Sequence, residues 1–223
     1  MSSPTPLEVS AGIIQGSGIG PVSVVVSDLT AVKPRNLLCK YADDTYLIIP
    51  SINVDTRLDE LANVEKWSRR NNLTLNPSKS QEIIFNDRRR KRCIQHSLLL
   101  PGINRVISIK ILGVTVSDSF SVCGHVNNVV TSCAQIVQAM RILRAHGMAT
   151  SSIYVIFNAI VVAKLTYAAS SWWAFTTAED RQRLEAVIRR CICSGLCAPD
   201  HISLENLATD ADDKLSNHNY CIQ

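Results

Sequence analysis

Two adjacent carboxylates, Asp43 and Asp44, lie inside the otherwise apolar, aromatic and β-branched run KYADDTYLII of residues 40–49. Two hard divalent cations about 4 Å apart, held by carboxylates, can clamp the attacking and leaving oxygens of a phosphoryl transfer. A site of this kind needs a third carboxylate. Adjacent acids are also common in exposed turns, so the pair alone leaves both interpretations open.

The residues around the acids predict how they are presented. Aromatic and branched residues flank a pair of turn formers, so residues 37–49 predict two strands around a tight turn at 42–45. This is a hairpin with carboxylates at its tip. An amphipathic helix is expected next, with Asp55 as its N-cap and Asn71 and Asn72 as its left-handed exit. Its expected inner face consists of Leu58, Leu61, Val64, Glu65 and Trp67.

Two further extended regions are expected before the pattern becomes helical. Residues 73–86 predict two short extended pieces around a turn at 76–79, and residues 105–117 predict a strand pair interrupted at Gly113. Helices are predicted from about Ser119 onwards. The last begins at Thr177 with an acid-rich first turn and ends at Gly195. Its expected apolar face consists of Leu184, Val187, Ile188 and Cys191.

Composition narrows the class of protein without selecting a function. With 223 residues, 46% hydrophobic and 19% charged, the chain is typical of a globular protein. Its net charge of +4 suits a polyanionic partner but does not require one. Eight cysteines and an N-terminus without a secretory pattern predict reduced thiols and an intracellular location, with nucleus and cytoplasm both open. The apolar stretch from Ile153 is interrupted by polar residues, which favours a buried helix and no membrane partner.

Four motifs in a fixed order carry a resemblance. QGSGIGP from Gln15, YADD from Tyr41, LTLNPSKS from Leu73 and ILGV from Ile111 resemble four consecutive palm motifs of reverse transcriptases, most of all those of non-long-terminal-repeat retrotransposons. The helical part, which includes SSWWAFTTAEDRQRLEAVIRRCICSGLCAPD, is similar to the segment that follows the palm in those elements. The resemblance therefore covers nearly the whole chain.

The resemblance implies a role for each motif. Asp43 and Asp44 would be catalytic ligands of Mg²⁺, and Tyr41 would lie beside the primer end. Gln15 and Gly16 would face the incoming deoxynucleotide triphosphate and the RNA template. Lys79 would be a catalytic residue near the departing pyrophosphate, as proton donor or charge stabiliser. The strand pair with Leu112 and Gly113 would be the primer grip for the DNA primer.

Each assignment has a simpler alternative. Gln15 and its glycines suit an ordinary loop, and Lys79 suits a solvated turn. The basic run Arg88–Arg92 could contact phosphates or direct nuclear import, although a solvated loop is favoured. Trp172 and Trp173 are expected in a core rather than on bases. The cluster Cys191, Cys193, Cys197 and His201 departs from paired zinc-ligand spacing, and a buried hydrophobic role for Cys191 is favoured.

One part of the family pattern is not found in the sequence. The family carries a further essential acid on a strand before the glycine loop, preceded by the fingers. Residues 1–10, MSSPTPLEVS, contain no Asp, and Glu8 is not in a matching context. Two neighbouring carboxylates do not by themselves fix two metal ions and in-line geometry, so the chain alone is expected to be inactive. The segment of the parent polymerase that carries the fingers would be an obligatory partner.

The expected fold is therefore α+β. A partial palm, an antiparallel sheet with packed helices, is predicted for residues 1–118. A helical thumb is predicted for 119–200 and a C-terminal tail for 201–223. The inherited activity would be RNA-directed DNA polymerisation by two-metal nucleotidyl transfer. The alternative is a non-catalytic module derived from such an element that binds nucleic acid or protein.

Overall fold

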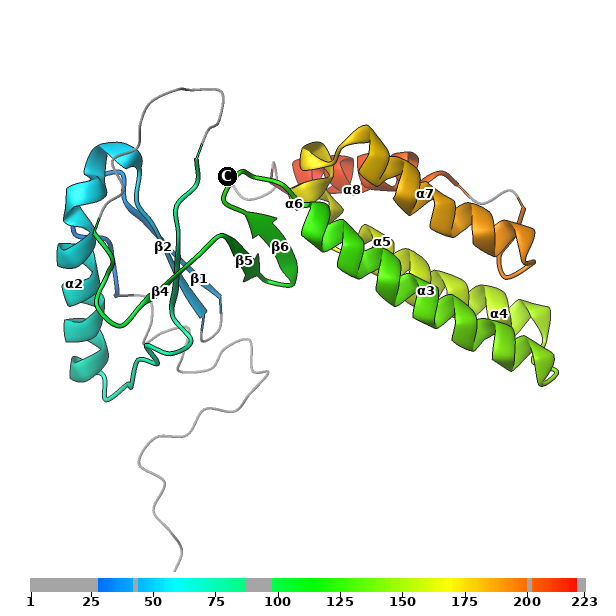
Figure 1. The fold of residues 1–223 in the computed structure, drawn as a ribbon, viewed down its shortest axis with the longest axis horizontal. Coiled ribbons are helices and arrows are strands. Elements are labelled where there is room, and N and C mark those ends of the chain that lie inside the picture. The colour runs from blue at the N-terminus through cyan, green and yellow to red at the C-terminus, as the bar shows by residue number, and fades with distance from the viewer. Residues whose placement is uncertain (1–27, 42–43, 87–97, 200–201, 220–223) are drawn as a thin grey trace, which may run out of the picture. The chain divides into compact units, whose positions relative to one another are not determined.

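The computed structural model describes residues 28–41, 44–86, 98–199 and 202–219. The fold is mixed α+β with small two-stranded sheets and several helices (Figure 1), which confirms the predicted class at this level. The chain packs as two compact units. The first consists of Met1–Ser80 and Gln95–Asn104, and the second of Gln81–Ile94 and Arg105–Gln223. These units reflect packing, whereas the palm and thumb regions are defined by motifs and stay predictions.

The first unit contains the expected hairpin. Strands β1 (Leu37–Tyr41) and β2 (Asp44–Ile48) are antiparallel, and the register runs from Leu37 opposite Ile48 to Tyr41 opposite Asp44. Asp44 and Thr45, which were expected in the turn, thus belong to the second strand. Only residues 42 and 43 lie between the strands, and both are outside the described residues. The hairpin prediction is confirmed, with a shorter connection than expected.

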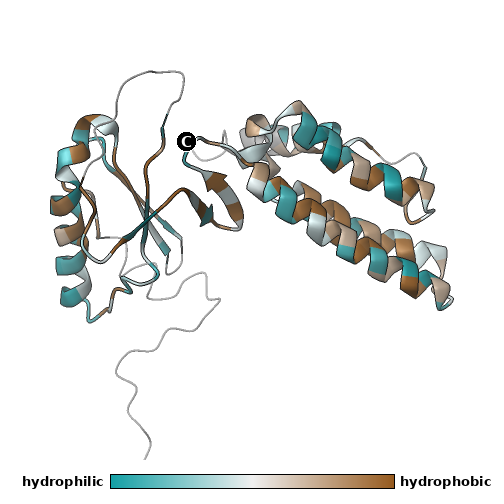
Figure 2. Cartoon of the chain, viewed as in Figure 1, coloured by the Kyte–Doolittle hydropathy of each residue, from teal (hydrophilic) through white to brown (hydrophobic). Residues whose placement is uncertain are grey.

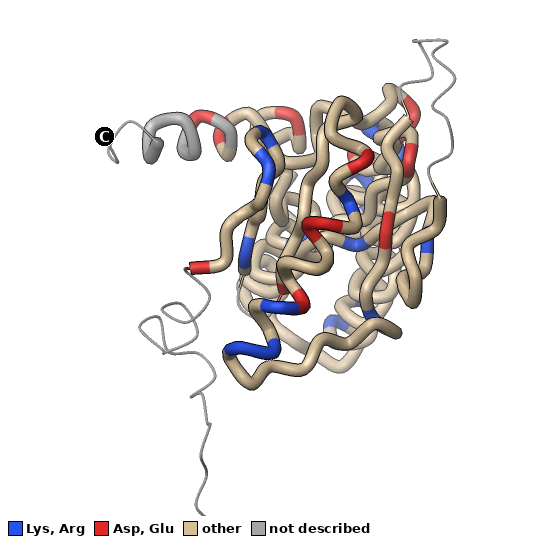
Figure 3. The backbone as a smooth tube through the Cα atoms, turned by 90° about the vertical axis from the view of Figure 1, so that its left-hand side faces the viewer, with Lys and Arg blue, Asp and Glu red and all other residues tan. Residues whose placement is uncertain are grey.

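A short 3₁₀ segment, η1 (Ser51–Thr56), leads into helix α2 (Arg57–Arg70). Asp55 lies inside η1, so the predicted N-cap is wrong; the cap position is Thr56, which forms no side-chain capping bond. At the exit, Asn72 has φ 53° and supplies the expected left-handed residue. Acids in the first turn of α2 and arginines in its last turn complement the helix dipole. On the side shown in Figure 3, acidic and basic residues are interspersed.

The buried face of α2 differs from the predicted one. Leu58 is 59% exposed, whereas Glu60 is fully buried. The Glu60 carboxylate accepts hydrogen bonds from the backbone amides of Val32 and Lys33, at 3.0 and 2.9 Å, and from Asn36 Nδ2 at 2.8 Å. Tertiary hydrogen bonds therefore override the 3.6-residue apolar pattern. Glu60 fixes the segment before β1 onto the helix that follows β2.

Strand β3 (Gln81–Ile83) of the second unit pairs with β4 (Asn104–Val106), which joins this unit at Arg105. Within the same unit, β5 (Ser108–Ile111) pairs antiparallel with β6 (Val114–Ser117). An ion pair of 2.7 Å joins Arg105 to Glu82. Leu112 and Gly113 connect β5 to β6, with φ values of 45° and 90°. Two central residues with positive φ fit the twist of a two-residue hairpin, so the predicted interruption at Gly113 is a tight turn.

The helical part of this unit begins with α3 (Cys123–Ala145). After α3 come α4 (Thr150–Ile156), a π-helical turn η2 (Phe157–Val162), α5 (Ala163–Thr166), α6 (Ala169–Trp172), the 3₁₀ turn η3 (Trp173–Phe175), α7 (Ala178–Cys193) and α8 (Leu204–Asn219). Apolar and polar residues alternate along these helices (Figure 2), and the buried apolar side chains form a single hydrophobic core. The largest fully buried side chains in it include Trp172, Phe157, Met140, Ile153, Leu165 and Leu184.

The apolar stretch from Ile153 is less regular than the expected buried helix. By length and composition alone, Thr150–Phe175 could cross a membrane, and 28% of its most apolar window is buried. Within the fold, one face packs into the core and the helix is broken by η2 and by Ala168, whose φ is 50°. The tertiary structure thus uses this stretch as several short core segments.

Helix α7 follows its predicted form. Thr177 caps it, and the Thr177 hydroxyl accepts from the Asp180 amide at 3.1 Å while the Asp180 carboxylate accepts from the Thr177 amide at 3.3 Å. This is a capping box. The four residues predicted for its inner face are all buried. Gly195, at φ 63°, follows the helix as expected.

Helix α8 lies in the region for which the sequence suggested only a tail. Its first residue, Leu204, is buried, and the Leu204 amide donates to the Glu185 side chain of α7 at 2.7 Å. Arg181 of α7 also lies 3.8 Å from Glu205. These contacts join residues about twenty positions apart, which a local pattern does not reveal.

Candidate functional site

The described end of the β1–β2 hairpin carries a carboxylate and a phenol. Tyr41 is 64% exposed, and Asp44, opposite it in the ladder, is also exposed. Tyr46 lies two residues after Asp44 in β2, and its hydroxyl donates a hydrogen bond to Asp44 Oδ2 at 3.4 Å. Asp43, Gln15 and Gly16 lie outside the described residues. The described part of the predicted site is therefore an open strand end.

Lys40, next to Tyr41, holds the hairpin to the preceding segment. Its ammonium donates to the Leu29 carbonyl at 2.7 Å. Burial lowers the pKa of Lys40, and the nearby Asp28 carboxylate partly opposes this effect. The Lys40 side chain is committed to this structural contact, which leaves Tyr41 and Asp44 as the exposed groups beside it.

Asp44 has the chemistry that a magnesium site requires, since Mg²⁺ prefers hard carboxylate oxygens and keeps several of its waters. Among the described residues, no group of three or more His, Cys, Asp or Glu side chains could hold a metal ion. Asp44 thus fits as one exposed ligand. The second predicted ligand, Asp43, falls outside the described part of the chain.

The turn at 76–79 is present as predicted. Asn76 Oδ1 accepts from the Ser78 hydroxyl at 2.6 Å and from the Lys79 amide at 3.3 Å, and the Asn76 carbonyl accepts from the Ser80 amide at 3.1 Å. Asn76 is therefore the residue that shapes the turn. Lys79 is exposed on it. This geometry suits a solvated lysine and a phosphate-facing lysine equally, and the catalytic role stays a prediction.

The predicted primer-grip turn is held by a residue that the sequence did not single out. The Tyr167 hydroxyl donates to the Leu112 carbonyl at 3.0 Å, and a Cβ added at Gly113 would lie 3.2 Å from the Tyr167 ring. Tyr167 is in turn held by Trp172, whose Nε1 donates to the Tyr167 carbonyl at 2.9 Å. Trp172 and Trp173 are both buried, as predicted. The turn is thus fixed to the helical core through one tyrosine.

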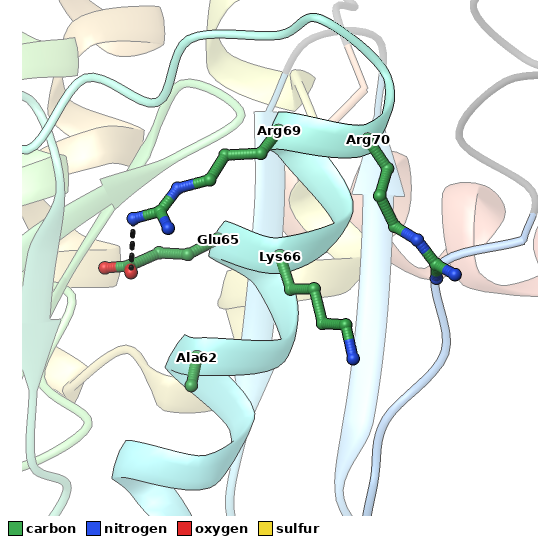
Figure 4. A pocket seen from close by; sticks show the side chains of 5 residues that line it. All are labelled: Ala62, Glu65, Lys66, Arg69 and Arg70. Atoms are coloured by element: carbon green, nitrogen blue, oxygen red, sulfur yellow. Dashed lines mark ion pairs between the residues drawn. The ribbon is translucent and has the colours of Figure 1, made fainter.

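A shallow charged depression of about 490 Å³ lies on α2, lined by Ala62, Glu65, Lys66, Arg69 and Arg70 (Figure 4). Arg69 lies 3.6 Å from Glu65, one turn away. Such an exposed pair contributes at most about 0.5 kcal/mol. The depression is the solvated outer face of a helix, and it contains none of the predicted site residues.

The cysteine cluster divides between core and surface. Cys191 and Cys197 are buried in the core, Cys193 is exposed, and His201 is outside the described residues. Burial, together with the neighbouring Cys197 and Cys133 thiols, raises the pKa of Cys191 to about 12. Burial raises the pKa of Cys197 to about 11. Cys191 therefore behaves as the small hydrophobic residue that the sequence favoured.

These thiols give a prediction for native alkylation. Only the thiolate reacts, so at pH 7.5 iodoacetamide is expected to modify exposed Cys39, Cys123 and Cys193 at least tenfold faster than Cys133 and Cys191. Peptide mass spectrometry over a time course would measure each rate. A urea-unfolded sample, in which all sites react alike, is the control. Fast native modification of Cys191 would contradict the core described above.

Comparisons with protein-family models, curated proteins and solved structures find no match to this chain. The family resemblance therefore rests on the sequence itself, that is, on the four ordered motifs and the helical segment that follows them. Two of their predicted local structures, the hairpin of the YADD motif and the tight turn of the ILGV motif, are present in the fold.

Proposed function

We propose that the chain is the C-terminal palm and thumb portion of a reverse transcriptase of the non-long-terminal-repeat retrotransposon type. Its inherited reaction is RNA-directed DNA polymerisation, a nucleotidyl transfer. Its partners are an RNA template, a DNA primer, a deoxynucleotide triphosphate and the fingers-bearing segment of the parent polymerase. The observation that supports this most directly is the β1–β2 register, which leaves Asp44 exposed opposite Tyr41 at the strand ends.

In this proposal each motif residue has one task. Asp43 and Asp44 supply carboxylate oxygens for Mg²⁺, which when bound neutralises phosphate charge and lowers the pKa of the attacking hydroxyl. Tyr41 lies beside the primer end, and Gln15 and Gly16 contact the nucleotide and template. Lys79 stabilises charge on the departing pyrophosphate. Leu112 and Gly113 position the primer, and their attachment to Tyr167 supports a rigid turn for that task.

The 223 residues by themselves are proposed to lack turnover, because phosphoryl transfer depends on positioning that two acids alone do not provide. Primer extension on an RNA template with Mg²⁺ tests this. We expect no extension by the chain or by Asp43→Ala. Extension by the chain that disappears in Asp43→Ala would establish the polymerase and overturn the proposed inactivity.

A second function, non-catalytic nucleic-acid binding, is favoured by the distribution of charge. The sequence has no Asp or Glu between Asp118 and Glu179, whereas Arg141, Arg144 and Lys164 in this interval are exposed. Exposed basic side chains attract polyanions. This function predicts that the chain binds an RNA–DNA hybrid with no higher affinity than other polyanions, and that the affinity falls steeply with salt concentration. That result would favour non-catalytic binding over the polymerase fragment.

A further inference from the structure

One buried ionisable side chain of the helical core lacks a hydrogen-bond partner. His125, in the first turn of α3, is 6% exposed, and no group in the described part of the chain bonds to its buried Nε2. Buried polar atoms are almost always hydrogen-bonded, so an exception needs an explanation. A neutral imidazole can leave one acceptor nitrogen unpaired, whereas in the imidazolium both nitrogens carry hydrogens. The position therefore suits the neutral ring.

His125 lies where the start of α3 packs against the β5–β6 hairpin and against α6. Its ring meets the Trp172 ring of α6 at 66°, with 5.0 Å between the two centroids. Trp172 is fully buried, so this contact is closed to water. Helix α3 also packs against β6, and a Cβ added at Gly124 would lie 4.0 Å from Thr115 Cγ2. Three elements thus meet around the imidazole.

The charge near His125 disfavours a proton on its ring. The Lys110 ammonium of β5 is the charged group that acts on it. Burial lowers the pKa of His125 below its ordinary value of 6.5, and the Lys110 charge lowers it further. A protonated ring in this position would therefore meet a second cation.

The other elements that pack on α3 do not offset this charge. From α7, Arg183 donates to the Asn127 side chain of α3, and Asp180 is committed to Arg183 at 3.7 Å and to the N-cap amide of its own helix. Lys164 of α5 acts on a thiol further along α3. Helix α4 carries Tyr154, and β6, η2 and α6 contain no ionisable side chain. Within the described residues, protonated His125 thus has a neighbouring cation and no paired carboxylate.

Trp172 connects His125 to the turn between β5 and β6. The Trp172 Nε1 donates to the Tyr167 carbonyl at 2.9 Å, and the Tyr167 hydroxyl donates to the Leu112 carbonyl at 3.0 Å. A Cβ added at Gly113, the second residue of the turn, would lie 3.2 Å from the Tyr167 ring. A continuous series of contacts therefore runs from the imidazole to the turn.

The connection passes through a bend that needs support. Ala168, between Tyr167 and α6, has φ 50°, a left-handed conformation that residues other than glycine adopt infrequently and at a cost in free energy. The hydrogen bond from Trp172 to the Tyr167 carbonyl spans this bend. Displacement of Trp172 would remove that bond, and Tyr167 would no longer be fixed against the turn.

We propose that His125 is a pH-sensitive switch: its neutral form holds Trp172 and Tyr167 in place, and its protonation releases the Leu112–Gly113 turn from the helical core. The imidazolium needs hydrogen-bond acceptors or water, so the charged ring leaves its site and Trp172 loses a packing partner. The switch is a property of the second unit and does not rest on the proposed function.

The lowered pKa of His125 sets the direction of the effect. The unfolded chain binds this proton more readily than the folded chain, so acid favours loss of the packed state. The stabilisation from neutral His125 is fully present above pH 6.5 and is lost as the pH falls through the folded value. Glu60 lies in the first unit and its pKa is below 4.5, so the two effects fall in separate pH ranges.

The test is an NMR titration of the isotope-labelled full chain between pH values of about 7.5 and about 5. The His125 Cε1–H signal reports protonation of the ring, and the Gly113 amide signal reports the turn. We expect a His125 midpoint below 6.5 and a change in the Gly113 signal with the same midpoint. His146→Gln, at the exposed C-terminal end of α3, is the matched control and should leave both unchanged.

Two variants separate a switch from an ordinary buried histidine. In His125→Phe, which keeps a ring against Trp172, the Gly113 signal should no longer change over this pH range. In Tyr167→Phe, which loses the hydrogen bond to Leu112, His125 should still titrate below 6.5 while the Gly113 signal no longer follows it. The two signals of the unaltered chain decide the question even where a variant does not fold.

A His125 midpoint at or above 6.5 would overturn the switch, and so would a Gly113 signal that does not follow His125 in the unaltered chain. A Gly113 change that persists in His125→Phe would also overturn it, because another group would then be the cause. Primer extension and nucleic-acid binding test the proposed function separately, so failure of the one is distinguishable from failure of the other.

Discussion

Replacing Trp172 with alanine is expected to lower the free energy of unfolding of the second unit by about 3–5 kcal/mol. Trp172 is fully buried, contacts the His125 and Trp173 rings, and donates to the Tyr167 carbonyl. Its removal leaves a large cavity and an unpaired carbonyl. A loss of this size approaches the whole stability of a small domain.

Urea denaturation followed by far-UV circular dichroism measures the Trp172→Ala effect. Trp172→Phe separates the two causes: it keeps most of the ring volume and loses the indole donor, so about 1–2 kcal/mol is expected. Ser171→Ala, at an exposed neighbouring position, should change little. If the urea concentrations at the unfolding midpoints of Trp172→Ala and Ser171→Ala are equal, Trp172 does not lie in the core described.

Replacing Glu60 with alanine is expected to destabilise the first unit by about 3–5 kcal/mol, because one buried donor and two partly buried donors then lose a charged acceptor. In Glu60→Ala, the rate of amide hydrogen exchange in peptides that cover residues 28–41 should rise strongly. Glu65→Ala, at an exposed position on the same helix, is the matched control. Unchanged exchange in Glu60→Ala would show that these hydrogen bonds do not hold the segment.

Glu60 also predicts how stability depends on pH. Burial alone would raise its pKa, but the hydrogen bonds from Val32, Asn36 and Lys33, together with the Lys33 charge, lower it below the ordinary value of 4.5. A carboxylate with a lowered pKa in the folded state stabilises the fold above its unfolded pKa. This contribution is lost as the pH falls from about 4.5 through the folded value. Glu60→Gln should flatten that part of the profile.

Local chemistry explains which elements the sequence predicted well. Thr177 and Asp180 form a capping box within four residues, and the apolar spacing of α7 is regular, so both its start and its buried face were predictable. The YADD hairpin and the Leu112–Gly113 turn are likewise short-range features. Element type follows from the sequence where neighbours in the chain determine it.

The sequence-based predictions fail where contacts between residues far apart in the chain determine the structure. The inner face of α2 is set by Glu60 bonding to a segment 27 and 28 residues away, which no helical periodicity reveals. Tyr167 fixes the Leu112–Gly113 turn across 55 residues. The stacked rings of Phe85, Phe120 and Phe175 likewise come from three separate segments. The proposed roles of Asp44 and Lys79 come from the motif resemblance alone, because an exposed acid or lysine has many uses.

Paramagnetic relaxation by Mn²⁺ tests most directly whether the end of the β1–β2 hairpin binds a divalent cation through the proposed ligands Asp43 and Asp44. With the ¹⁵N-labelled full chain, substoichiometric Mn²⁺ should broaden the amide resonances of Tyr41 and Asp44 before those of other residues. Excess Mg²⁺ should reverse this effect, and Asp43→Asn/Asp44→Asn should abolish it. Broadening that is centred elsewhere, or that persists in the double variant, would contradict the claim.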